Sequence, residues 1–218
     1  MISGKSALRL VALLIVGPVA LAEGLDVDLE PYLAAARAGA VGVLDGRAFE
    51  ESRTPDGRPK PLGGTTLTLL PRSDGFLGAL EEIKRQSRDS MQAYRTSATS
   101  VRQAREAYEA ELRLRGGAPL VLTAVVAPDG TFELGEVPEG AWVLIATRSV
   151  LVDKTTTPIK KKDRSTFLLG PRVVGYHAVS TWLLPMRVAG GRSERVELTD
   201  RNVWLTGIAE RTGPDSGR

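Results

Sequence analysis

His177 is the only histidine of the chain, so it is the one imidazole that could serve as a general base. A serine hydrolase built on His177 would use Ser180 or another serine as its nucleophile. The sequence contains no G-x-S-x-G nucleophile elbow, and no residues mark an oxyanion hole. Because His177 follows Tyr176 in a strand-like run, we expect a structural role for it and predict no catalytic residue.

Metal chemistry has few candidate ligands in this sequence. The chain has no cysteine, which excludes disulfides, a thiolate metal site and a cysteine nucleophile. A single histidine without cysteine cannot supply the three or four ligands of a zinc site. Asp26 and Asp28 form a D-x-D pair that lacks the glycine and further ligands of a calcium loop. We therefore predict no metal and no cofactor.

A pair of carboxylates could act as the acid and base of a glycosidase. The nearest approach to a cluster is Glu133, Glu136 and Glu139. Glu133 alternates with Phe132 and Leu134, which places its side chain on the solvent face of a strand. The other two lie in turn sequence, so we interpret all three as solvated, and a carboxylate-based hydrolase remains a minor alternative.

Two glycine pairs and one run of lysines are the remaining candidates for a binding site. Gly63-Gly64 and Gly190-Gly191 are typical of turns, and neither opens a helix in a phosphate-binding G-x-G-x-x-G frame. The run Lys160-Lys161-Lys162 lies in a polar stretch over residues 152–171, which we interpret as an exposed loop. Such a run could touch an anionic polymer, but more often it keeps a loop in water.

Three tryptophans, Trp142, Trp182 and Trp204, could stack on a sugar ring if their faces were exposed. Tryptophan in a strand is more often part of the core, because it buries a large area. Trp204 is the candidate ligand-binding residue, since Val203 and Leu205 already claim the opposite face of its strand.

The first 22 residues have the features of an export signal. Lys5 and Arg9 precede an apolar run over residues 10–19, and Ala20-Leu21-Ala22 supplies a small-x-small cleavage pattern. The run is shorter than the roughly 20 residues of a membrane span, although an uncleaved anchor stays an alternative. We predict export to the periplasm or the medium, with no later membrane span.

Removing the signal would leave 196 residues with a formal net charge of +1, since Lys5 and Arg9 lie within it. That near balance gives no electrostatic reason to expect a nucleic-acid partner.

Most of the mature chain consists of short strand-like runs between turn residues. After a short helical segment over residues 23–40, alternating or β-branched runs recur between residues 41 and 210, separated by turns such as Pro128-Asp129-Gly130. The run over residues 142–145 is apolar on both sides and belongs at the centre of a sheet. We expect a disordered tail over residues 211–218.

One segment has helical periodicity instead. Apolar residues recur three or four positions apart over residues 76–114, with no glycine or proline between Gly78 and Gly116. Because strands flank this segment, we predict a helical hairpin inserted over residues 74–116. The bend is expected at residues 96–100, where serine and threonine compete with the helix, giving two helices of about 30 Å each.

Two blocks of the sequence resemble carboxypeptidase regulatory-like domains, a transthyretin-like sandwich family. Residues 61–69 (PLGGTTLTL) resemble one signature of that family, and residues 129–134 and 137–142 resemble its later hairpin. Residues 46–48 would form the first strand. The resemblance covers roughly half of the mature chain, in blocks that the helical segment separates. It implies an accessory sandwich and no catalytic residues.

We therefore predict a mainly β protein: an antiparallel β-sandwich, transthyretin- or immunoglobulin-like, with an inserted α-helical hairpin. The function that we expect is a non-catalytic, exported interaction module that binds another envelope or secreted protein through the hairpin. The alternatives are a carbohydrate-binding sandwich that uses Trp204 and, less favoured, the hydrolase.

Overall fold

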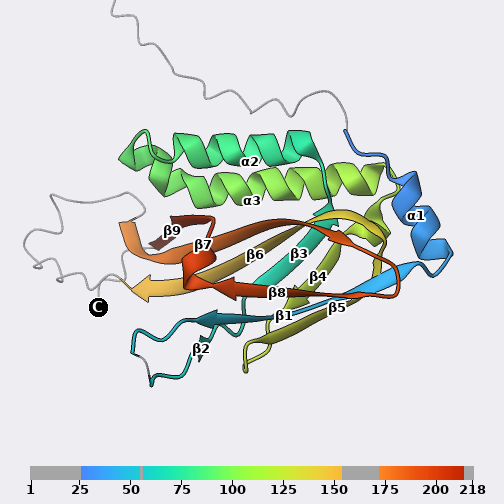
Figure 1. The fold of residues 1–218 in the computed structure, drawn as a ribbon. Helices are drawn as coiled ribbons and strands as arrows, with labels where there is room; N and C mark the ends of the chain where they lie inside the picture. The colour runs from blue at the N-terminus through green and yellow to red at the C-terminus, as the bar shows by residue number, and fades with distance from the viewer. Residues whose placement is uncertain (1–25, 55, 154–171, 214–218) are drawn as a thin grey trace, which may run out of the picture.

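The computed structural model describes residues 26–54, 56–153 and 172–213, which form two stacked β-sheets and a helical hairpin (Figure 1). One sheet has four strands and the other has five. Helices α2 and α3 lie on the face of the five-stranded sheet that points away from the four-stranded sheet (Figure 1). The predicted class, a mainly β sandwich with an inserted helical hairpin, is confirmed.

The elements in chain order are α1 (Glu30–Arg37), β1 (Val41–Glu50), β2 (Lys60–Pro61), β3 (Thr66–Pro71), α2 (Asp74–Gln86), α3 (Met91–Leu114), η1 (Ala118–Leu120), β4 (Leu122–Val125), β5 (Thr131–Pro138), β6 (Gly140–Asp153), β7 (Arg172–Val188), β8 (Ser193–Thr199), η3 (Asp200–Asn202) and β9 (Leu205–Gly213).

The four-stranded sheet is built around β1. Strands β2 and β5 run antiparallel to β1, whereas β8 runs parallel to it, with residues 43–49 opposite residues 193–199. This pair adds one parallel contact to the antiparallel pattern that we predicted. A parallel pair needs a long crossover, and here the whole five-stranded sheet except β9 lies between β1 and β8 in the chain.

The five-stranded sheet is antiparallel throughout, in the order β4-β3-β6-β7-β9. Its middle strand, β6, carries Val143, Leu144 and Ile145, each at most 1% exposed although neighbouring side chains point to opposite faces. The apolar run at residues 142–145 is therefore central, as predicted. One face of β6 packs against the four-stranded sheet, and the other needs a second cover.

The helical hairpin provides that second cover. Phe76 and Leu80 of α2 and Val101, Tyr108 and Leu112 of α3 are buried in the same core as the strands. The rings of Phe76 and Tyr108 stack 4.4 Å apart at 11°, and the Tyr108 hydroxyl donates to the Pro71 carbonyl over 2.9 Å. The hairpin is thus part of the core.

The position of the bend in the hairpin was predicted wrongly. The two helices meet between Ser87 and Ser90, and α3 runs without a break through residues 96–100. Ser90 begins α3, because its hydroxyl accepts the Ala93 N–H over 3.0 Å. Thr96 and Ser97 donate to carbonyls one turn back, so their hydroxyls are satisfied inside the helix. With 13 and 24 residues, the helices are about 20 and 36 Å long.

Small residues in α3 allow a close approach to the sheet. A Cβ atom added at Gly207 of β9 would lie 2.9 Å from Ser97 Oγ and 3.1 Å from the Ala98 Cβ. Both Ser97 and Ala98 are buried. The residues that we had assigned to a bend therefore form the contact between α3 and β9.

Helix α1 closes one end of the sandwich, within the helical segment expected at residues 23–40. The Tyr32 ring meets Trp142 edge-on, with centroids 5.2 Å apart, and its hydroxyl donates to the Ala141 carbonyl over 2.5 Å. Gly39 follows the helix with φ of +68°, a conformation that glycine adopts readily.

The remaining expectations concern the chain ends and one loop. Strand β9 continues to Gly213, so residues 211–213 belong to a strand and not to the predicted disordered tail. The rest of that tail, the signal segment over residues 1–22 and the lysine run 160–162 lie outside the described residues. Strand β6 continues to Asp153, so the predicted loop does not begin at residue 152.

The close contact between α3 and β9 predicts the effect of enlarging Gly207. We expect Gly207→Val to lower the free energy of unfolding by about 1–3 kcal/mol, because the new side chain would push α3 off the sheet. Urea unfolding followed by circular dichroism measures this change. Gly135→Val in β5 is the matched control, since a Cβ there would have no atom within 4 Å. Equal losses in both variants would contradict the close packing.

Asp26 gives the fold a pH dependence at the start of α2. Burial alone would raise its pKa, but hydrogen bonds from the Ser73 hydroxyl and the Gly75 N–H hold the pKa below its ordinary value of 3.8. The ionised carboxylate therefore stabilises the fold above pH 3.8, and this contribution disappears as the pH falls through the lowered pKa.

We expect Asp26→Asn to cost about 0.5–1 kcal/mol at pH 7 and nothing at low pH, where the native carboxyl is also neutral. Unfolding midpoints measured between pH 7 and pH 2 test this. Asp89→Asn is the control, because no hydrogen bond to its carboxylate occurs within the described part of the chain. If Asp26→Asn lowered the free energy of unfolding by the same amount at all pH values, the ionised carboxylate of Asp26 would not be the stabilising group.

Candidate functional site

A cavity of about 360 Å³ lies between α3 and the outward face of the five-stranded sheet. Small-molecule sites in proteins typically measure roughly 300–1,000 Å³, so this cavity is of ligand size. Its floor comes from β3, β6, β7 and β9, and its roof comes from α3. The polar floor residues are Thr66, Thr147, Ser149, His177 and Thr181.

The side chains of the cavity floor become polar in the part of the sheet where α3 no longer buries them fully. On the helix-facing side of β6, Ile145 is buried, Thr147 is half-buried and Ser149 is exposed. Strand β7 follows the same course, from the buried Thr181 to the half-buried His177. Along β6, burial decreases as the residues change from apolar to polar, whereas β7 presents the apolar Val179 between Thr181 and His177. This part of the sheet therefore offers polar groups to water or to a ligand.

Two arginines of α3 form the charged side of the cavity, Arg102 and Arg105. Arg105 Nη1 reaches Thr68 Oγ1 at 3.5 Å, and its Nε lies 3.2 Å from Glu109 Oε1. That Nε is buried and has no hydrogen-bond partner, so the contact with Glu109 is an ion pair without hydrogen-bond alignment. Arg102 Nε lies 3.9 Å from Glu106 Oε1, a looser pair.

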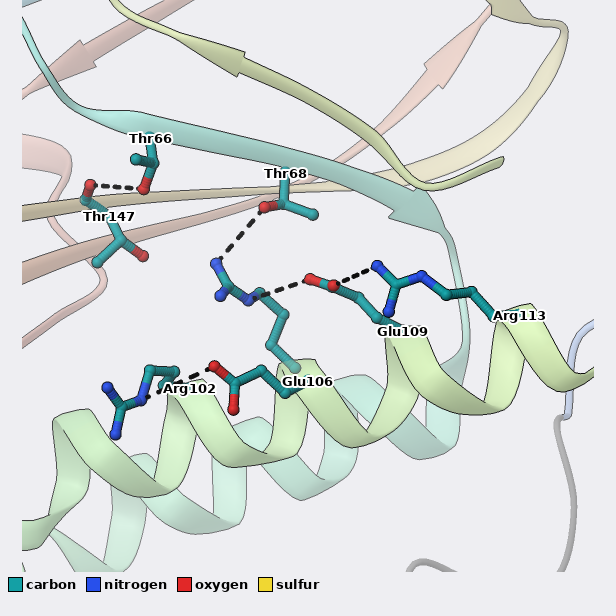
Figure 2. Close-up of polar contacts among 8 residues, drawn as sticks. Thr66, Thr68, Arg102, Glu106, Glu109, Arg113 and Thr147 are labelled. Carbon is teal, nitrogen blue, oxygen red and sulfur yellow. Dashed lines mark hydrogen bonds and ion pairs between the residues drawn. The ribbon is translucent and has the colours of Figure 1, made fainter. Parts of the chain in front are cut away.

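Figure 2 shows how these groups are arranged along α3. Arg102, Glu106, Glu109 and Arg113 project from successive turns of the helix, and Thr68 lies on the strand opposite. Glu109 also pairs with Arg113, whose Nη2 donates to Oε2 over 3.0 Å. One carboxylate is therefore shared by two guanidinium groups. Among the described residues that line the cavity there are two arginines and one histidine, and none is an acid.

The hydroxyl groups of the floor are held by short contacts between strands. Thr66 Oγ1 donates to the Thr147 carbonyl over 3.2 Å (Figure 2). Ser149 Oγ lies 3.1 Å from His177 Nδ1, and either group can donate, depending on the tautomer of the ring. Both contacts join neighbouring strands of the floor.

The pair of Ser149 and His177 is the one arrangement that resembles a nucleophile with its base. A triad would also need an acid to orient the imidazole, and no acid is found among the described lining residues. Ser180, the serine that we had weighed, is on the same strand as His177 but three residues away, so it points to the other face of the sheet. Within the described lining, Ser149 and His177 therefore offer a ligand hydrogen-bonding groups and no acid to orient the imidazole.

Two tryptophans lie in the core as expected, whereas Trp204 precedes β9, which begins at Leu205, and so does not lie in the strand that we predicted for it. Trp142 and Trp182 are at most 1% exposed, so neither can stack on a ligand. Trp204 is half-buried against α2: its Nε1 donates to Glu81 Oε1 over 2.7 Å, and Lys84 Nζ lies 5.0 Å from the ring centroid. Trp204 does not line the cavity beside α3.

The acidic residues considered from the sequence lie outside the cavity beside α3. Glu133, Glu136 and Glu139 are all exposed, as predicted. Asp28 Oδ1 accepts the Glu30 N–H over 3.1 Å at the start of α1, and Asp26 does the same for α2. Each aspartate of the D-x-D pair therefore accepts an N–H from the first turn of a helix, a role that the sequence pattern did not reveal.

The glycine pairs are turn residues as predicted, with φ of +79° at Gly64 and +69° at Gly191. Within the described residues there is no group of three or more metal-ligating side chains. No helix in the described ranges has the length and apolar character needed to cross a membrane.

Comparisons with known proteins give no family. No protein-family model matches the sequence, and no curated protein matches it. The resemblance to carboxypeptidase regulatory-like domains is therefore not confirmed as a family assignment, although the β-sandwich that it implied is present.

Three solved structures show weak similarity. A candidate carbohydrate-binding protein from Pseudomonas aeruginosa is 16% identical, with a TM-score of 0.42 over 81% of this chain and 99% of that one. A minor pilin of Streptococcus agalactiae is 11% identical, with a TM-score of 0.29 over 82% and 48% of the two chains. The pilus backbone protein of Streptococcus pneumoniae is 12% identical, with a TM-score of 0.26 over 72% and 40%. The chain spans less than half of either pilin, and with TM-scores below 0.5 we base the assignment of the site on its own geometry.

Sequence reasoning missed this cavity. From the sequence we expect His177 in a strand and Arg102 and Arg105 in the helical segment, but Thr147 and Ser149 lie outside every strand that we predict. The available signal was the change from apolar to hydroxyl residues at alternate positions of β6, which marks the end of a buried face.

Proposed function

We propose that this chain is a non-catalytic, exported binding module that holds a small sugar-like ligand in the cavity beside α3. The observation that carries the proposal is a cavity of about 360 Å³ with a floor rich in hydroxyl groups. Threonine and serine hydroxyls both donate and accept hydrogen bonds, which matches the hydroxyl groups of a sugar. Export rests on the signal predicted in residues 1–22.

The apolar part of the cavity supports the same class of ligand. Ile145, Val179 and Ala209 lie among the polar floor residues. A sugar ring presents C–H groups on its faces and hydroxyls at its rim, so it can use both kinds of surface at once. The combination of apolar walls with a few placed polar groups is typical of small-molecule sites.

The binding test uses D-glucose, D-galactose and N-acetylglucosamine, titrated into the full chain and followed by ¹H–¹⁵N NMR. We expect amide shifts to cluster on Thr66, Thr147 and Ser149 for at least one sugar. Thr147→Leu fills the cavity and removes a hydroxyl, which should weaken binding about tenfold.

Thr123→Leu is the matched control, because Thr123 is an exposed threonine of the edge strand β4. The affinity of this variant for the sugar should equal that of the unmodified chain. Shifts centred on Trp204 would instead favour the tryptophan site predicted from the sequence, and the absence of shifts with all sugars would reject the proposal.

A second candidate function is the interaction with another exported protein through the hairpin. The apolar stripe of the hairpin is buried, so a partner would meet its outer surface and its tip. Met91 at the tip is 68% exposed, so its apolar side chain is accessible to a partner there.

A photo-crosslinking amino acid placed at Met91 should give one defined product in the native host. The same group at Leu114 is the control, since Leu114 is 82% exposed at the other end of α3. Equal product patterns from both positions would indicate random collisions and count against a docking surface at the tip.

A further inference from the structure

We infer that the ligand of the cavity beside α3 carries an anionic group, a carboxylate or a phosphate, which Arg102 and Arg105 bind. This inference rests on the proposed function and specifies the class of the ligand as an acidic sugar. It is drawn from the charges around the cavity and from the way in which the two guanidinium groups are held.

The charges that line the cavity have one sign. Arg102 and Arg105 both reach its edge, and no carboxylate is found among the described lining residues. The nearby acids, Glu106 and Glu109, pair with these arginines from outside the lining. A neutral sugar alone would not require two cations at this place, because the serine and threonine hydroxyls of the floor already offer donors and acceptors to its hydroxyl groups.

Arg105 is held in position by the protein but is not fully neutralised by it. Its side chain is only 20% exposed, and its guanidinium group contacts Thr68 through Nη1 and Glu109 through Nε. Glu109 divides its charge between Arg105 and Arg113, so the group of two arginines and one glutamate keeps a net positive charge. A guanidinium that is already ordered loses little entropy when it binds an anion.

Arg102 supplies a second, more adaptable cation. It lies one turn before Arg105, so both side chains leave the same face of α3. Its side chain is 62% exposed, and its 3.9 Å contact with Glu106 is at the limit of an ion pair. Exposed pairs of this kind contribute little energy, so Arg102 can exchange its partner for a ligand anion at small cost.

The floor opposite the arginines explains why the ligand should be a sugar acid and not a simple anion. Thr66, Thr147 and Ser149 offer hydroxyls, and His177 adds a ring nitrogen at the far end. Guanidinium groups bind carboxylate and phosphate through two parallel hydrogen bonds. A ligand with an acidic group at one end and hydroxyls at the other would use both sides of the cavity.

The experiment compares D-glucuronate, D-glucose 6-phosphate and D-glucose by isothermal titration calorimetry at low salt. We expect at least one of the two acidic sugars to bind about tenfold more tightly than glucose, and the preference to shrink as salt is added. Which acidic sugar binds better identifies the anionic group. Sodium phosphate alone should bind more weakly than the preferred acidic sugar.

The variants Arg102→Gln and Arg105→Gln, made singly and together, should remove the preference for the acidic sugars and leave glucose binding in place. Arg115→Gln is the matched control: it removes the same charge at the end of α3 and breaks an ion pair with Glu111, but Arg115 neither lines the cavity nor pairs with Glu109. Circular dichroism and urea midpoints establish that each variant is folded.

Three results would overturn the inference. Equal affinity for glucose and both acidic sugars would reject the anionic group while leaving the proposed function intact. An equal effect of Arg115→Gln would show that the charge of α3 as a whole, and not the two lining arginines, sets the preference. No binding of any sugar would reject the inference together with the proposed function.

Discussion

The five-stranded sheet is apolar on both faces at its centre, and the rest of the structure depends on covering both of them. Val143, Leu144 and Ile145 alternate between the faces of β6, yet all three are buried. A sandwich supplies one cover, through the four-stranded sheet. The second cover must come from elsewhere in the chain, because an exposed apolar face of this size would drive association. The helical hairpin meets this need.

Because the outer face of the five-stranded sheet must be covered, the inserted helices have a structural role. The hairpin is not an appendage on a finished sandwich, because Leu80, Val101 and Leu112 belong to the same buried cluster as the strands. Its two helices are unequal, and the longer one, α3, lies close to β9 at Gly207. Ser97 and Ala98 are small where the backbones approach, and larger aromatic rings fill the wider space between the helices.

The candidate site follows from the limit of this cover. A single helix covers only part of the sheet, and where its cover becomes incomplete β6 and β7 present Thr147, Ser149 and His177 beside Val179. The flank of α3 carries arginines at this border because their long apolar stems can pack on the sheet while the guanidinium groups face the polar space. The site therefore lies at the boundary between the buried and the solvent-exposed parts of the sheet. The sheet contributes hydroxyl groups to it, and α3 contributes two cations.

The sequence by itself determined the class of the fold, the central place of β6 and the helical character of the insertion, because these depend on local periodicity and on which side chains avoid water. It also indicated that Trp142 and Trp182 are core residues. It could not place the bend of the hairpin, since serine and threonine can cap a helix, as Ser90 does, or bond inside one, as Ser97 does. Only the tertiary structure brought Arg105 over the floor that Thr147 and Ser149 form. Contacts between residues of different helices and strands cannot be predicted from the spacing of residues along the chain, because they depend on how the layers pack.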